Sequence, residues 1–190
     1  MALVMKRKGY GQVEPNHLSG IVTGQIYAQL PAAYTKTESN GTVTYSGITQ
    51  LEQGQFAKYD YAAGKVNFTG DGEFMLVYNE EKLYDERKQS HKDFVYRIKD
   101  FTDEQMYPRL IRTYVGDIMT TNTISVANTA DDAEVGTTSV SVGNYLTVNS
   151  NGFLDLSTAT TMPSSGMVWK VVKEYTMPDG QPGIKIQRVQ

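Results

Sequence analysis

The chain has 190 residues, of which 39% are hydrophobic and 21% are charged, and its net charge is −3. A chain of this length can bury a core without disulfides, and the absence of cysteine excludes thiol catalysis and cysteine-bound zinc. The small net charge provides no long-range field to attract nucleic acid, so no nucleic-acid partner is expected.

Residues 1–63 are predicted to form an extended N-terminal arm with a few short strands. They are poor in charge and rich in glycine, glutamine and tyrosine, and glycine lowers the stability of a helix. The basic residues Lys6, Arg7 and Lys8 follow the apolar start of the chain, whereas a secretion signal has its positive charges first. Polar residues interrupt the uncharged run at 15–35, so no membrane span is expected.

One hairpin is predicted within this arm. The dipeptide Asn40-Gly41 separates the segments 35–38 and 42–45, which are rich in threonine. Asparagine and glycine tolerate the positive φ angles of a two-residue turn, and threonine suits a strand.

Residues 64–118 hold much of the charge and are predicted to form a β-rich central domain with one short helix. The helix is expected at 79–91, where Asn79 could cap its start. Alternating or apolar segments bounded by turn residues predict strands at 65–68, 73–78, 93–99 and 110–115.

Residues 119–190 are predicted to form a small C-terminal β-barrel or sandwich. Turn signals at 149–152 and 177–182 separate short apolar segments at the spacing that small barrels and sandwiches show. Trp169 lies in the densest apolar segment of this region and is expected in or near its core. The predicted strands are 123–126, 139–142, 145–148, 153–156, 167–175 and 184–189.

No arrangement of residues indicates an enzyme, a cofactor or a metal site. The two histidines, His17 and His91, lie in different regions, and the common nucleophile, metalloprotease and phosphate-loop motifs are absent. The carboxylates of Asp131, Asp132 and Glu134 could in principle bind calcium, but their spacing does not match a calcium loop. A solvated loop is the favoured interpretation.

Four segments of the chain resemble small virion proteins of tailed bacteriophages. They are GEFMLVYNEEK (72–82), RKQSHKD (87–93), YPRLIRTYVGDIMTTN (107–122) and WKVVKEYTMPDGQPGIKIQR (169–188). The resemblance covers about residues 66–190 and implies a head decoration, or cement, protein on the capsid exterior, made in the host bacterial cytoplasm. It implies the major capsid protein as a partner, and a second copy of the chain in a homo-oligomer as another. It carries no catalytic residues.

The arm is the expected partner-binding region, because a chain without its own core becomes ordered only against a surface. Ile21, Ile26, Tyr27, Leu30 and Tyr34 are predicted to anchor it, while Lys6, Arg7 and Lys8 meet acidic groups of the partner. An arm folded back on its own domain is the alternative. For the whole protein, the alternative function is a receptor- or glycan-binding module of a head or tail fibre.

Overall fold

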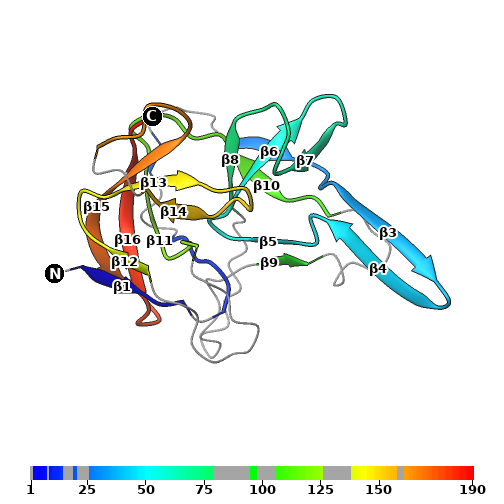
Figure 1. Ribbon diagram of the computed structural model, residues 1–190, viewed down its shortest axis with the longest axis horizontal. Coiled ribbons are helices and arrows are strands. Elements are labelled where there is room, and N and C mark those ends of the chain that lie inside the picture. Colours follow the sequence, from blue (N-terminus) through cyan, green and yellow to red (C-terminus); the bar gives the residue numbers. More distant parts are fainter. Residues whose placement is uncertain are drawn as a thin grey trace.

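The computed structural model describes residues 2–7, 9–14, 19–20, 26–78, 95–97, 106–125, 138–157 and 161–190. All the regular secondary structure in these ranges is β-strand (Figure 1), which confirms a mainly β fold. The helix predicted at 79–91 lies outside the described residues. Within them, no helix is long and apolar enough to cross a membrane.

The strands are short and follow one another closely along the chain. They are β1 (Leu3–Met5), β2 (Ile26–Gln29), β3 (Tyr34–Ser39), β4 (Thr42–Gly47), β5 (Gln50–Glu52), β6 (Phe56–Asp60), β7 (Lys65–Asn67), β8 (Phe74–Val77), β9 (Val95–Arg97), β10 (Arg109–Ile111), β11 (Ile118–Thr121), β12 (Thr138–Val140), β13 (Tyr145–Val148), β14 (Leu154–Leu156), β15 (Val168–Thr176) and β16 (Pro182–Arg188).

The C-terminal region forms a curled sheet with the strand order β11-β16-β15-β13-β14. Its two ends meet where Ile124 forms a parallel bridge with Leu154, and the Ser125 N–H donates to the Leu154 carbonyl oxygen at 2.8 Å. The sheet therefore curls into a half-barrel, called the barrel below. Trp169 is 1% exposed in its core, which confirms the expected burial. Val172 is exposed, because it is the extra residue of a bulge in β15.

A second sheet, with the order β2-β10-β8-β6-β7, packs beside the barrel. Side chains alternate along β6 and β8, so Phe56 and Leu76 join the barrel core while Ala57 and Met75 join a second apolar cluster. Both faces of these strands are therefore buried. The predicted strands β7 and β8 both occur, but each pairs with β6 and not with the other.

The strand pairing contradicts the prediction that residues 1–63 form an extended arm. β1 pairs with β12, β2 with β10, β5 with β9, and β6 with β8. Met5, Val13 and Phe56 lie in the same apolar cluster as Trp169. The described part of the segment is therefore built into the body of the protein, and the predicted boundary at residue 63 does not separate the sheets.

Candidate functional site

Arg7 was expected at the rim of a partner interface, but it is an interior residue. Its side chain is only 8% exposed, and its Nη1 lies 2.8 Å from Oε2 of the equally buried Glu52. The guanidinium carbon also lies 5.4 Å from the centroid of the Phe153 ring. A buried charge needs a close counter-charge, and Arg7 finds it in Glu52 of its own chain, so the ion pair holds the N-terminal segment to the body of the protein.

Buried hydrogen bonds continue this attachment along the backbone. The Gly11 N–H donates to Oε2 of Glu52 at 2.8 Å, and the Gln12 N–H donates to Oδ1 of Asn122 at 2.8 Å. A Cβ at Gly11 would lie 2.3 Å from Oγ1 of Thr123, so only glycine allows this close approach. The polar residues here are held in place by the fold, which makes them a structural anchor.

The anchor also reaches the turn between β15 and β16. Gln12 Nε2 donates to Oδ2 of Asp179 at 2.8 Å, and the backbone and side chain of Gln181 donate to the same carboxylate. Partial burial raises the pKa of Asp179, but these hydrogen bonds outweigh it and hold the pKa below its ordinary value of 3.8. The stabilisation is present above the pKa of the unfolded chain and is lost as the pH falls through the lower folded pKa.

We expect Gln12→Ala to raise the pKa of Asp179 towards 3.8, because the variant removes one donor to the ionised carboxylate. Titration of the Asp179 carboxyl carbon by nuclear magnetic resonance measures this directly. Gln187→Ala is the matched control, because the side-chain amide of Gln187 donates to the Gly116 carbonyl oxygen and not to Asp179. An unchanged Asp179 pKa in Gln12→Ala would contradict the assignment.

The other predicted anchors also contact their own chain or lie outside the described residues. Leu30 and Tyr34 are half-buried against the second apolar cluster. Ile26 and Tyr27 lie on β2, which pairs with β10, but the positions of their side chains are not among those the structure describes. Lys6 is exposed, whereas Lys8 and Ile21 lie outside the described residues. Of the predicted anchors whose side chains are described, Arg7 is buried and Leu30 and Tyr34 pack against their own chain, whereas Lys6 is exposed.

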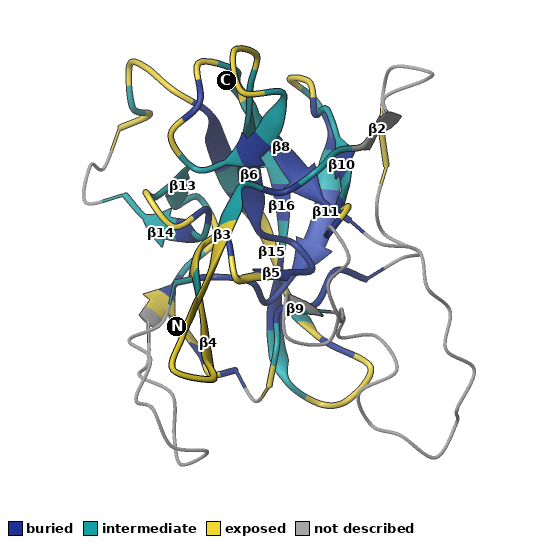
Figure 2. Cartoon of the chain, turned by 90° about the vertical axis from the view of Figure 1, so that its right-hand side faces the viewer, coloured by how far each residue is buried: buried dark blue, intermediate teal, exposed yellow. Residues whose placement is uncertain are grey.

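Among the strands whose side chains are described, those of the β3–β4 hairpin are the most exposed, and the hairpin projects from the body (Figures 1 and 2). Its six residue pairs run from Tyr34–Gly47 to Ser39–Thr42. The turn residues Asn40 and Gly41 have φ angles of 50° and 74°, as a two-residue turn of this kind requires. The Asn-Gly signal therefore predicted the hairpin correctly.

The two faces of the hairpin differ in chemistry. Side chains alternate along each strand, so one face carries Lys36, Glu38 and Val43, with Tyr34 and Tyr45 at its base. The two tyrosine rings are 6.2 Å apart and pack against the second cluster. The opposite face carries only hydroxyl side chains, which belong to Thr35, Thr37, Ser39, Thr42, Thr44 and Ser46.

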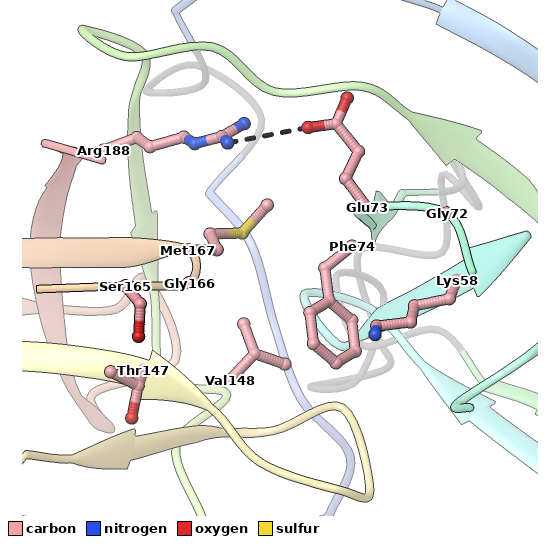
Figure 3. Close-up of a pocket in the computed structure, with 10 residues that line it drawn as sticks. All are labelled: Lys58, Gly72, Glu73, Phe74, Thr147, Val148, Ser165, Gly166, Met167 and Arg188. Carbon is pink, nitrogen blue, oxygen red and sulfur yellow. Dashed lines mark ion pairs between the residues drawn. The ribbon is translucent and has the colours of Figure 1, made fainter. Parts of the chain in front are cut away.

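A pocket of about 410 Å³ lies between the barrel and the second sheet (Figure 3). Lys58 and Phe74 line one side, with the ammonium 4.8 Å from the ring centroid. Thr147 and Met167 line the other. At the edge, Arg188 Nη2 lies 3.7 Å from Oε2 of Glu73. The pocket thus combines an aromatic ring, positively and negatively charged side chains, and hydroxyl groups.

Comparisons with known proteins identify no relative of this chain: no protein-family model, no curated protein and no solved structure matches it.

Proposed function

We propose that the protein is a non-enzymatic structural protein of a phage virion, which decorates and stabilises the capsid by binding between capsomers on its exterior. The observation that carries the proposal is the β3–β4 hairpin, which projects from the body and is exposed on both faces beyond its base. The resemblance of four segments to phage virion proteins supports the same function.

An isolated two-stranded ribbon is only marginally stable in water. Among the described residues, Tyr34 and Tyr45 are the hairpin side chains that pack against an apolar cluster, and the part of the hairpin beyond them belongs to neither cluster. Such an element is suited to joining a neighbouring sheet or surface in an assembly. Many copies on one capsid would turn a weak contact of this kind into firm attachment.

The test is a variant in which Asn-Gly replaces residues 35–46, so that Tyr34 and Gly47 remain joined by a two-residue turn. Because the removed part lies outside the core apart from Tyr45, the variant is expected to fold. We expect it to lose binding to capsids that lack the protein, measured by co-sedimentation, while the complete chain binds. The control is Thr161→Ala, a change of an exposed residue elsewhere in the chain.

Two outcomes would contradict the proposal. One is a complete chain that does not sediment with capsids, and the other is a truncated, folded variant that binds as well as the complete chain. The first would remove the capsid function altogether. The second would place the capsid-binding surface outside the hairpin.

The pocket favours a second candidate function, a receptor- or glycan-binding module of a head or tail fibre. An aromatic ring with nearby charged and hydroxyl groups can stack on a sugar and hydrogen-bond its hydroxyls. Phe74, Lys58 and Thr147 provide such groups. Under this alternative, Phe74→Ala would weaken binding in a screen of bacterial surface oligosaccharides, and Phe68→Ala, a half-buried ring of the second cluster, is the control.

A further inference from the structure

The tip of the β3–β4 hairpin carries an asparagine that is followed directly by a glycine. Asn40 and Gly41 are both exposed, and a Cβ at Gly41 would meet no atom within 4 Å. In a two-residue turn, the flanking residues Ser39 and Thr42 exchange the hydrogen bonds. Neither the Asn40 side chain nor the Gly41 N–H has a hydrogen-bond partner among the described residues. The side-chain amide and the backbone nitrogen beside it are therefore both open to solvent.

Asparagine is a chemically labile residue, and a following glycine favours its reaction with the main chain because glycine has no Cβ to hinder the approach. The Gly41 nitrogen attacks Cγ of Asn40, so that a new C–N bond closes a succinimide ring. The bond between Cγ and Nδ2 breaks, and Nδ2 leaves as ammonia together with the proton of the Gly41 N–H. Water then opens the ring at either carbonyl carbon, which gives aspartate or isoaspartate. The reaction consumes only water.

The hairpin tip can reach the geometry that this reaction needs. Ring closure requires the Asn40 backbone to rotate out of its left-handed turn conformation, in which φ is 50°. The outer part of the hairpin belongs to neither apolar cluster, and a two-stranded ribbon alone is only marginally stable. Local opening of the tip therefore costs little free energy.

A second Asn-Gly pair, Asn151-Gly152, is held closed by the fold. Asn151 is exposed as well, but its N–H donates to Oδ1 of Asn149 at 2.9 Å. The Gly152 N–H donates to the Asn149 carbonyl oxygen at 3.0 Å, and the Gly152 carbonyl oxygen accepts from the Phe56 N–H at 2.7 Å. A Cβ at Gly152 would clash with the Phe56 carbonyl oxygen. Opening of this turn must therefore break its contacts with β6.

We propose that Asn40 is a site of spontaneous deamidation, and that its isoaspartate product disrupts the strand pairing in the outer part of the hairpin. In isoaspartate the main chain runs through Cβ and Cγ, so the turn becomes longer. A two-residue turn sets the register of its strands, and the longer turn cannot keep Ser39 opposite Thr42. Aspartate leaves the main chain unchanged, and Asp-Gly suits the same turn. The isoaspartate product alone therefore breaks the pairing.

This chemistry sets a lifetime for the hairpin, which goes beyond the proposed capsid binding. Under the proposed function, the molecules that carry isoaspartate would be those that no longer bind the capsid. The deamidation and the loss of pairing are both measured on purified protein without capsids. Their outcome is therefore independent of the capsid-binding experiment, and a failure of either proposal is recognised separately.

The first experiment compares Asn40 with Asn151 in the same molecule. The purified protein is incubated in mildly alkaline buffer, and peptide mapping by mass spectrometry follows the replacement of each side-chain amide by a carboxyl group. We expect Asn40 to react at least roughly tenfold faster than Asn151, because the reaction needs local opening. In urea, where neither turn persists, Asn151 is expected to react about as fast as Asn40.

Three results of this experiment would overturn the proposal. One is an equal rate at Asn40 and Asn151 in the folded protein, and another is the absence of reaction at Asn40. The third is a difference between the sites that persists in urea, because the fold would then not set the rates.

The second experiment measures the hairpin in the reacted protein. Amide hydrogen exchange, read by mass spectrometry, compares the isoaspartate form with the freshly purified protein. We expect exchange over β3 and β4 to be at least roughly threefold faster in the isoaspartate form, and exchange over β15 and β16 to be unchanged. N40D is the matched control, because it has the added negative charge without the lengthened main chain, and its exchange should equal that of the parent. An isoaspartate form with the parent's exchange, or an N40D variant that exchanges as fast as the isoaspartate form, would overturn the proposal.

Discussion

Replacing Trp169 with alanine is expected to lower the free energy of unfolding by about 3–5 kcal/mol. The side chain is 1% exposed, and its ring centroid lies 5.8 Å from that of Phe56 at an interplanar angle of 50°. Phe56 belongs to the second sheet, so Trp169 joins that sheet to the barrel. The truncation therefore leaves a cavity between two sheets that neither can easily close.

Urea unfolding followed by circular dichroism measures the effect, because Trp169 is the chain's only tryptophan and the variant has no tryptophan fluorescence. Trp169→Phe is the matched control. It keeps a ring beside Phe56 and removes the indole N–H, which has no hydrogen-bond partner among the described residues. Its loss of stability should be clearly smaller. An alanine variant that unfolds at the parent's urea concentration would contradict the position of Trp169 in the core.

Replacing Arg7 with methionine is expected to lower the free energy of unfolding by about 3–5 kcal/mol, because Glu52 would remain buried without its counter-charge. The Glu52 carboxylate keeps hydrogen bonds from the Gly11 N–H at 2.8 Å and from Gln50 Nε2 at 3.2 Å. These neutral donors only partly replace a guanidinium. Methionine retains much of the apolar stem of arginine but not the guanidinium that lies over the Phe153 ring.

The double variant Arg7→Met/Glu52→Gln separates the charge from the packing. Glutamine removes the unpaired charge and still accepts from Gly11, so much of the lost stability should return. Lys173→Met, at an exposed position, is the control and should change stability by less than about 0.5 kcal/mol. A double variant less stable than Arg7→Met would show that the loss comes from packing and not from the buried charge.

Turn chemistry explains which parts of the fold were predictable. Asn40-Gly41 and the Pro178-Asp-Gly turn each join strands that are neighbours in sequence and in space, so local residues determine the pairing. The strand β6 was not predicted, because what distinguishes it as a strand is its pairing with β7 and β8 in the folded sheet. The short, glycine-rich sequence around it has no periodicity that distinguishes a buried strand from an extended arm.

The candidate site was predictable to a smaller extent, for a related reason. The alternation of threonines beside Asn40-Gly41 predicted a hairpin, but nothing in it shows that the hairpin projects from the body. Arg7 was placed at the surface because it belongs to a basic cluster with Lys6 and Lys8. Its burial depends on Glu52, which lies 45 positions further along the chain and became its neighbour only through the fold.

The way the N-terminal segment is built into the barrel affects the order of events during synthesis. Leu3 pairs with Val140, and Met5 shares an apolar cluster with Ile186 on β16. A ribosome releases β1 long before either partner exists, so β1 cannot reach its final place until β12 and β16 have been synthesised. Closing such distant contacts is slow. The barrel core is therefore completed only after translation has passed β16, and until then the apolar side chains of the first strands are open to chaperones and to aggregation.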